Sequence, residues 1–354
     1  MLGAVALAGC ERRTPLPPLP STPAAQVASA PGVAPVDGPT LKAVRARGRL
    51  RCGVADDLRG FASRDVLGQW RGFDVDVCRA VAAAVFGDSR KVQFVPLTAK
   101  QRFTALQNDQ VDLIARGGLS FGRDTGLGLD FVGVSFFDGQ GFLVRKALEG
   151  KSAADLAGQR ICVQAGTSNE LNLTEHYRDA TLRPVKVLAD SEAAALEAYL
   201  AGDCDALSED RAALAAVRAS LRGADGHVVL PDEISKDPQG PVVRQGDSQW
   251  ADLVRWTLNA LILAEEMDVT AKTVAEQRDQ PASPEIGRLL AGDGLGQQLL
   301  LKDDWAFQVI RQVGNYGEIF ARNLGSDSDL GLERGRNAQW NATPPGLLYA
   351  PPMR

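Results

Sequence analysis

The sequence has few of the Cys and His residues that bind zinc, and it has no long apolar run. Only two histidines, His176 and His227, occur in 354 residues, and no Cys-x-x-Cys pair is present. Because zinc sites need clustered Cys and His ligands, we expect no metal and no cofactor. No run of about 18 apolar residues, the length of a membrane-spanning helix, is present. The net charge of -5 argues against a nucleic-acid or anionic-membrane partner for the folded part.

The five cysteines are an odd number, and the first of them, Cys10, stands apart. Leu7-Ala-Gly-Cys10 ends a short apolar run and resembles the lipobox of bacterial lipoproteins, in which the signal is cut before a lipidated cysteine. A Pro-rich stretch follows that cannot form a core. We therefore expect a lipoprotein-type signal over residues 1–10, lipidation of Cys10 and a disordered tether over residues 11–40. The alternative is an ordinary leader with a chance cysteine.

From residue 41 onward, apolar periodicity and turn residues predict two series of strands and helices. The first series has expected elements at residues 41–47 (helix), 49–54 (strand), 74–87 (helix), 92–95 (strand), 101–108 (helix), 111–115 (strand) and 142–145 (strand). The second has them at residues 160–164 (strand), 169–177 (helix), 185–188 (strand), 191–201 (helix), 204–207 (strand), 211–220 (helix) and 227–230 (strand). Such alternation implies parallel sheets with right-handed crossovers.

The rest of the chain returns to the first series and is mostly helical. A crossover is expected at residues 242–243, followed by helices at residues 248–266, 285–290 and 304–323 and an extended tail at residues 325–354. We expect lobe one to comprise residues 41–145 and 240–354, the latter with a C-terminal helical extension, and lobe two to comprise residues 146–239. Two α/β lobes joined by two crossovers form a clamshell that closes on a ligand between them.

Residues 112–138 hold the strongest candidate for a ligand contact. Strand 111–115 opens into a Gly-rich loop that is followed by Arg123. An Arg just past a strand end lies where α/β sheets bind ligands, and its planar fork suits a carboxylate. The alternative is a surface Arg123 that pairs with Asp124 or Asp130.

Several motifs in order resemble the polar amino-acid-binding proteins of ABC importers, which are periplasmic solute-binding proteins of family 3. They are Gly72-Phe-Asp-Val-Asp76, Gly166-Thr-Ser168, Gly202-Asp-Cys-Asp-Ala206 and Asn315-Tyr-Gly-Glu-Ile-Phe320. Phe137-Asp-Gly-Gln-Gly-Phe142 and the four internal cysteines resemble the general L-amino-acid-binding subfamily in particular. The resemblance covers about residues 41–354. It implies a type II periplasmic-binding-protein clamshell of two α/β lobes, each a sheet flanked by helices, joined by two hinge crossovers.

The resemblance also implies roles for individual residues. Arg123 would hold the α-carboxylate of the ligand and Asp210 its α-ammonium, because a zwitterion needs one cation and one anion on opposite walls. Thr167 and Ser168 would supply hydroxyl and backbone donors. For Asp210 the alternative is the N-cap of the following helix, with which a ligand contact is compatible.

The sequence departs from the subfamily at Arg116-Gly-Gly-Leu-Ser-Phe-Gly122, where an Asn-Thr-Thr-Trp-Thr run is typical. Gly118 lies in this altered stretch and is a candidate ligand contact, Ser120 retains one hydroxyl that would complete the hydrogen bonds to the ligand, and Phe121 takes the place of the Trp. We therefore expect a weaker or altered ligand preference.

Apart from Cys10, the cysteines form an even set suited to an oxidising compartment. They allow three pairings, and four buried free thiols are a further alternative. Cys52 is expected on a strand and Cys78 on the helix that packs against it, whereas Cys162 and Cys204 fall on one small sheet. We predict Cys52–Cys78 and Cys162–Cys204, because a bond between lobes would hinder hinge motion.

These observations predict a binding protein and not an enzyme. It would capture free amino acids outside the cytoplasm, in the periplasm or cell envelope, and deliver them to the membrane subunits of an ABC importer. We expect a monomer that contacts the membrane only through its lipid anchor. One alternative is a cyclohexadienyl-dehydratase-like lyase, which needs a cleft carboxyl or His with a shifted pKa, and Asp210 is the only candidate. Another is a degenerate ligand sensor on the same fold.

Overall fold

The computed structural model describes residues 36–55, 58–98, 100–178, 184–292 and 294–354. Cys10 and nearly all of the expected tether lie outside these residues. The tether boundary at residue 40 needs correction, because helix α1 (Pro39–Arg47) begins at Pro39, in the first turn where proline is favoured. Thr40 is buried in this turn, and its backbone N–H donates to Asp247 Oδ2 over 2.9 Å.

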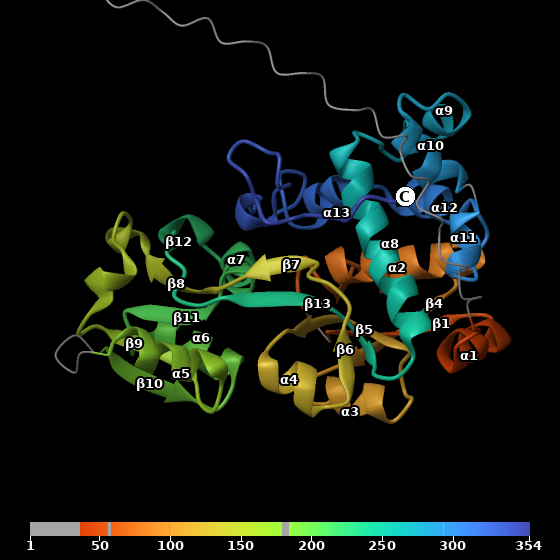
Figure 1. Ribbon diagram of the computed structural model, residues 1–354. Coiled ribbons are helices and arrows are strands. Elements are labelled where there is room, and N and C mark those ends of the chain that lie inside the picture. The colour runs from red at the N-terminus through yellow and green to blue at the C-terminus, as the bar shows by residue number, and fades with distance from the viewer. Residues whose placement is uncertain (1–35, 56–57, 99, 179–183, 293) are drawn as a thin grey trace, which may run out of the picture. The chain divides into compact units, whose positions relative to one another are not determined.

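The first sheet combines parallel and antiparallel strands. Its order is β4 (Val92–Leu97), β1 (Leu50–Ala55), β5 (Leu113–Gly118), β13 (Asp237–Arg244) and β6 (Leu129–Phe131), with β7 (Phe136–Asp138) also paired to β13. β4, β1 and β5 are parallel, as the alternation predicts, whereas β13 runs antiparallel to β5, β6 and β7. Figure 1 shows β13 beside β5 and β7. A small hairpin joins β2 (Ser63–Arg64) to β3 (Trp70–Arg71).

Helices pack on both faces of this sheet. The helices around it are α2 (Phe73–Phe86), α3 (Arg102–Gln107), α4 (Phe121–Gly126) and α8 (Ser248–Glu266). α2 packs on β1, β4 and β5, and its apolar residues join those of α8 in the main core. Leu106 of α3 contributes to a separate apolar cluster with Ile114 and Val242. α2 ends where expected, at Gly87, whose φ of 67° is a backbone conformation that glycine adopts easily.

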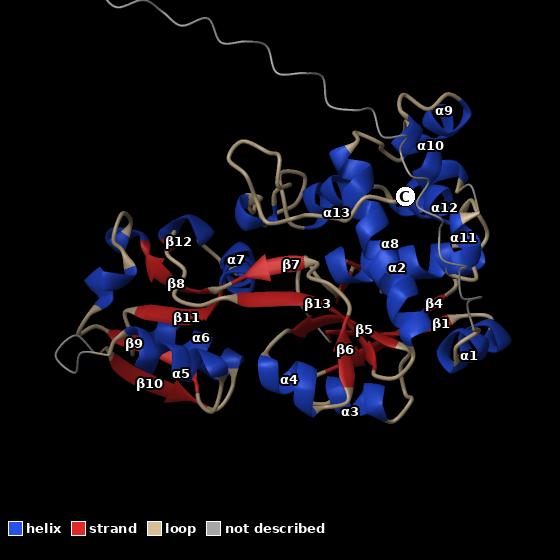
Figure 2. Cartoon of the chain, viewed as in Figure 1, coloured by secondary structure: helices blue, strands red, loops and turns tan. Residues whose placement is uncertain are grey.

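The second sheet has the strand order β10 (Val185–Ala189), β9 (Arg160–Gln164), β11 (Ala206–Asp210), β8 (Gln140–Arg145) and β12 (His227–Val229). Its helices are α5 (Ser168–His176), α6 (Glu192–Ala201) and α7 (Arg211–Ser220), and its 3-10 turns are η1 (Lys146–Leu148), η2 (Ala153–Leu156) and η3 (Ala224–Gly226). α5 packs near one apolar cluster and α6 and α7 near another, on the two faces of the sheet. Figure 2 shows the strands of the two sheets in separate groups, each with helices beside it.

The position of strand β8 shows that the expected boundary between the two lobes is wrong. We placed residues up to 145 in lobe one, but Gln140–Arg145 lies between β11 and β12 in the second sheet. Its central residues Phe142, Leu143 and Val144 are fully buried there, which fits an interior strand. The chain therefore leaves the first sheet after β7, at Gly139, and returns to it in β13.

The C-terminal part adds a helical layer beside the first sheet. Its elements are α9 (Val274–Asp279), α10 (Pro284–Ala291), α11 (Leu295–Gln298), α12 (Trp305–Val313), α13 (Tyr316–Asn323) and η4 (Gly335–Asn337). α12 packs against α2 and α8. The single helix expected over residues 304–323 is wrong, because Gly314 has φ 91° and ψ -179° and interrupts it. Asn315 then starts α13 through a capping box with Glu318.

Both predicted disulfides are present. Cys52–Cys78 joins β1 to α2, and Cys162–Cys204 joins β9 to the residues before β11. All four cysteines are fully buried. Within the part of the chain that the structure describes, no helix is both long and apolar enough to cross a membrane.

Candidate functional site

A cavity of about 340 Å³ lies between residues of the two sheets. One wall is formed by the ends of β1, β4 and β5 with part of β13, and the other by the end of β11 with the first turns of α6 and α7. The carboxyl ends of parallel strands are where open α/β sheets bind ligands. The polar residues that line the cavity are Thr98, Arg102, Arg116, Glu192, Glu209, Asp210 and Gln239.

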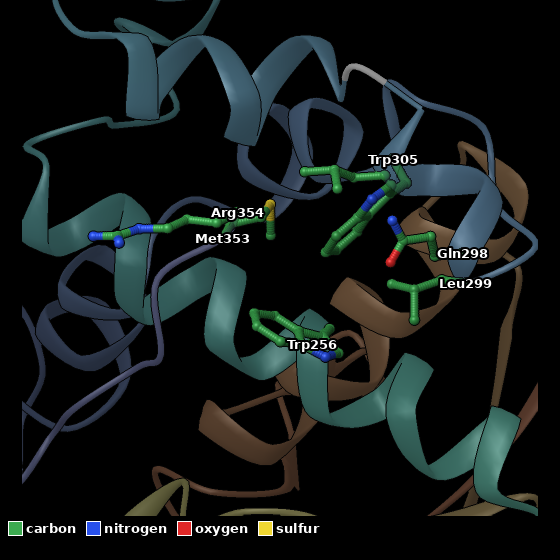
Figure 3. A pocket seen from close by; sticks show the side chains of 7 residues that line it. Trp256, Gln298, Leu299, Trp305, Met353 and Arg354 are labelled. Carbon is green, nitrogen blue, oxygen red and sulfur yellow. The ribbon is translucent and has the colours of Figure 1, made fainter. Parts of the chain in front are cut away.

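A second, smaller pocket has a different character. Its volume is about 100 Å³, and Figure 3 shows the side chains of Trp256, Trp305 and Met353 around it. Arg354 is its one charged side chain, and it has no acidic residue. The side chains of this pocket therefore lack the pair of opposite charges that a zwitterion requires, whereas the cavity between the two sheets has both.

Asp210 lines the larger cavity, as the sequence predicts. It occupies the N-cap position of α7, but its side chain makes no cap hydrogen bond. The backbone N–H of Ala212, in the same turn, donates instead to Asp138 Oδ1 over 3.4 Å. The carboxyl group of Asp210 is therefore not used to cap the helix and is left to face the cavity.

Arg123 lies in the short helix α4 and not in a loop, and it is not among the residues that line the cavity. Its Nη1 donates to the carbonyl oxygen of Gly118 over 3.0 Å. A Cβ atom at Gly118 would lie 2.7 Å from this nitrogen, so glycine permits the approach. Within the described chain, Arg123 forms no ion pair with Asp124 or Asp130. The alternative of a paired surface arginine therefore does not describe it.

The three predicted hydroxyl residues lie outside the lining of the cavity. The Thr167 hydroxyl donates to Gln164 O over 2.7 Å and accepts from Glu170 N over 3.3 Å, so it caps α5. Ser168 and Ser120 are both exposed, at the first position of α5 and the N-cap of α4. Asp210 is thus the one predicted ligand residue that lines the cavity in this structure.

Arg116, for which the sequence predicts no role, lines the cavity from β5. Its Nη2 lies 3.2 Å from Asp138 Oδ2, and its guanidinium carbon lies 4.0 Å from the centre of the Phe61 ring. Its Nη1 is buried and has no hydrogen-bond partner in the described part of the chain. The sequence feature that could have identified Arg116 as a site residue is its position in an otherwise apolar strand, because a buried charge needs a partner.

Arg102, at the start of α3, was also missed, and it strengthens the positive charge of this wall. Its Nη1 donates to the carbonyl oxygen of Arg116 over 3.3 Å. Burial and, after it, the charges of Arg123 and Arg116 lower the pKa of Arg102 to about 10. The guanidinium carbons of Arg102 and Arg123 lie 5.1 and 5.6 Å from the centre of the same Phe103 ring, so Arg123 lies near the cavity wall although it does not line it. No local sequence pattern marked Arg102.

The opposite wall is acidic. The pKa of Glu209 is raised to about 8, chiefly by burial and to a smaller extent by the charges of Asp210 and Glu192. The pKa of Asp210 is raised to about 7, chiefly by burial and to a smaller extent by the charges of Asp138 and Asp237. Asn169 Nδ2 donates to Glu209 Oε1 over 2.6 Å. The cavity thus has a cationic wall on the first sheet and an anionic wall on the second.

Comparison with known proteins agrees with this geometry. Residues 50–274 match the family described as bacterial extracellular solute-binding proteins, family 3. The general L-amino acid-binding periplasmic protein AapJ of Rhizobium johnstonii is 47% identical over 91% of this chain and 95% of its own length. The glutamate/glutamine/aspartate/asparagine-binding protein BztA of Rhodobacter capsulatus is 48% identical over 89% of this chain and 93% of its own.

Among solved structures, a periplasmic binding protein of an ABC transporter from Brucella ovis, with glutathione bound, superposes with a TM-score of 0.83. The two chains are 50% identical, and the matched region spans 89% of this chain and 99% of the Brucella chain. The expected fold, two α/β units of the type II periplasmic-binding-protein class, is thereby confirmed.

Proposed function

Because the chain belongs to the bacterial extracellular solute-binding proteins of family 3, we propose that it captures free amino acids outside the cytoplasm for an ABC importer. The observation that carries this proposal is the pair of oppositely charged walls around one cavity. A free amino acid is a zwitterion at neutral pH, and each of its charged ends gains a charge-assisted hydrogen bond in such a site. The relatives AapJ and BztA, whose names state amino-acid binding, support the same reading.

In the proposed clamp, Arg123 holds the α-carboxylate and Asp210 holds the α-ammonium. Gly118 leaves room for the Arg123 guanidinium, and Arg102 adds positive charge beside it. Ser168 and Ser120 supply hydroxyl donors. Since the Thr167 hydroxyl already caps α5, Thr167 contributes through its backbone. Closure of the two lobes over the ligand would bring Arg123 and the exposed serines into the lining of the cavity.

The same clamp is compatible with the ligand of the Brucella protein. Glutathione has a free α-amino-acid end, which is the group that Arg123 and Asp210 would recognise. The altered stretch around Gly118, which lacks most of the hydroxyls typical of the subfamily, would then change the affinity or preference of the site and not its class of ligand.

The lyase alternative meets one of its requirements, because the pKa of Asp210 is raised within a cavity. The raised pKa, however, follows from burial beside other carboxyl groups, and an ammonium ligand would relieve it equally well. With several relatives named as binding proteins, amino-acid capture is the function that we propose.

We further propose that the protein is a monomer held at the membrane by a lipid on Cys10. The motivation is the lipobox-like sequence and the Pro-rich stretch after it. Mass spectrometry of the N-terminal peptide of the mature protein tests the anchor. An unmodified mature peptide that contains both Ala8 and Cys10 would rule it out.

Titration calorimetry with the common amino acids tests the proposed function. At least one should bind the wild type, whereas Arg123→Ala and Asp210→Ala should each lose about 30- to 5,000-fold in affinity, because each variant leaves one charge of the ligand unpaired. Asp124→Ala, an exposed neighbour on α4, is the matched control and should bind as the wild type does. Equal binding by all variants would refute the residue roles, and no binding by the wild type would refute the function.

A further inference from the structure

The acidic wall of the cavity has more carboxyl groups than one α-ammonium can bind. Glu192, Glu209 and Asp210 all line it. Among the described residues, none of the three forms an ion pair with a lysine or arginine. If Asp210 takes the α-ammonium, as proposed above, Glu209 and Glu192 remain without a cationic partner.

The cationic wall has no comparable surplus. Arg116 is already paired with Asp138. The guanidinium carbons of Arg102 and Arg123 lie 5.1 and 5.6 Å from the centre of the same Phe103 ring, and the charge of Arg123 lowers the pKa of Arg102. Two guanidinium groups so close together suit a single carboxylate that they share, because the shared anion offsets their mutual repulsion. The α-carboxylate therefore uses Arg102 and Arg123, and the cation that remains on this wall, Arg116, is already paired with Asp138.

Buried polar atoms along the cavity show that it is built for a polar occupant. Arg116 and Gln239 line the cavity and are only 8% and 6% exposed, and each has one buried side-chain atom, Nη1 and Oε1 respectively, without a hydrogen-bond partner in the described chain. A buried polar atom without a partner has a free-energy cost that a polar ligand removes. The acidic surplus thus belongs to a polar binding cavity and not to a solvated surface.

We propose that the ligand carries a second cationic group on its side chain, as arginine, lysine and ornithine do, and that Glu209 binds this group. The inference rests on the proposed function and names the ligand class of the same site. Glu192, which is exposed at the start of α6, attracts the side chain at the outer end of the cavity.

Glu209 is prepared for this contact. Its Oε1 accepts the short bond from Asn169 Nδ2, which orients the carboxyl group and leaves Oε2 for the ligand. Burial and the neighbouring acids raise the pKa of Glu209, so a cation beside it replaces repulsion by attraction. A carboxylate placed next to Glu209, as the side chain of glutamate would place it, would meet the same acids as like charges, so the cavity selects against glutamate.

Arginine and citrulline are a suitable pair of probes, because citrulline replaces the guanidinium by a neutral urea group of nearly the same shape. Calorimetry should show that the wild type binds arginine about 10- to 100-fold more tightly than citrulline. In Glu209→Gln this ratio should fall to about 3 or less, since the amide can still accept the bond from Asn169 but carries no charge. Glu197→Gln removes the same charge from an exposed position of α6 outside the cavity and should keep the wild-type ratio.

The outcomes separate this inference from the proposed function. If glutamine or glutamate binds the wild type more tightly than arginine does, the cationic preference is refuted while amino-acid capture stands. If arginine is preferred but Glu209→Gln keeps the full ratio, Glu209 is not the partner and the proposal is overturned. If no amino acid binds, the proposed function itself fails. Circular dichroism of each variant establishes that it is folded before its ratio is interpreted.

Discussion

Arg116 on β5 and Asp138 at the end of β7 form a buried ion pair, with 3.2 Å between Nη2 and Oδ2 and side chains that are 9% and 3% exposed. The other carboxylate oxygen of Asp138 accepts from the backbone N–H of Gly139 over 2.9 Å and of Ala212 over 3.4 Å. Ala212 lies in the first turn of α7, two residues after Asp210. One carboxylate thus connects a strand of the first sheet to the backbone that positions Asp210 on the second.

The first prediction is that Asp138→Asn destabilises the protein by about 3–5 kcal/mol, because it leaves the buried charge of Arg116 without a charged partner. Urea denaturation followed by circular dichroism measures the change. Asp205→Asn is the control, since the pair of Asp205 with Arg160 is partly exposed, at 30% and 47%, and should contribute less than about 1 kcal/mol. Equal losses in the two variants would contradict the special role of the buried pair.

A second prediction concerns the C-terminal tail, which packs against the strand before the crossover. The Asn337 side chain accepts from the backbone N–H of Phe137 over 2.7 Å and donates to its carbonyl oxygen over 3.0 Å. Asn337→Ala leaves both backbone groups without these partners and should destabilise the protein by about 2–3 kcal/mol. The neighbouring Arg336→Ala removes only an ion pair with Glu233 from a side chain that is 45% exposed, and should change stability by less than about 1 kcal/mol.

Chemical denaturation of the two variants decides this point. A larger loss in Arg336→Ala than in Asn337→Ala would show that the ion pair, and not the backbone contact, holds the tail.

Most of the fold could be predicted because its signals are local. Gly87 and Gly202 end helices where expected, and Ser191 caps α6, since each acts within one turn of the chain. The placement of β8 could not be predicted in this way. Its residues show only that it is a buried strand, and its sheet is decided by pairing with β11 and β12, which come more than sixty residues later. The break at Gly314 was missed because the apolar periodicity continues through it.

The candidate site was predicted in part. Asp210 follows a strand end, and both the motif and the position identify it. Arg102 and Arg116 were missed because a side chain lines a cavity as a result of tertiary contacts, and those of Arg116 come from Phe61 and Asp138. Sequence spacing does not report such contacts.

The third prediction concerns the disulfides. Cys162 and Cys204 are 42 residues apart and Cys52 and Cys78 are 26 apart, so each bond restricts a long segment of the unfolded chain. Replacing either pair by serine should destabilise the protein by about 3–4 kcal/mol. Amino-acid affinity at low temperature should be retained, since each bond lies within one sheet and its helix. Denaturation and calorimetry on the two double variants check both statements, and a folded variant that has lost binding would contradict the second.

The fourth prediction uses the buried carboxyl group of Asp74, in the first turn of α2. Asp74 is 1% exposed, and neither of its carboxyl oxygens has a hydrogen-bond partner in the described residues. Burial raises the pKa of Asp74 from 3.8 to about 6, although the charges of Arg116 and Arg102 oppose the shift. The folded protein therefore retains this proton at pH values where the unfolded chain has lost it.

The raised pKa gives the pH dependence a definite sign. Below about pH 4 Asp74 is protonated in both the folded and the unfolded protein and does not affect stability. As the pH rises, the buried carboxyl group lowers the free energy of unfolding, and this loss is complete above about pH 6, at about 3 kcal/mol for a pKa difference of about two units. Asp74→Asn removes this cost, so it should stabilise the protein at pH 7.5 by up to about 3 kcal/mol and by much less at pH 4.5. Urea denaturation at the two pH values measures the difference.

Asp76, two residues later on the same helix, is the control for this experiment. Its Oδ2 accepts from Arg322 Nη2 and from Asn323 Nδ2, each over 2.8 Å, so Asp76→Asn should lower stability at pH 7.5. If Asp74→Asn instead lowers stability, as Asp76→Asn does, and by the same amount at pH 4.5 and pH 7.5, then ionised Asp74 must stabilise the fold through Arg102 and Arg116. Burial would then not be the dominant effect on its carboxyl group.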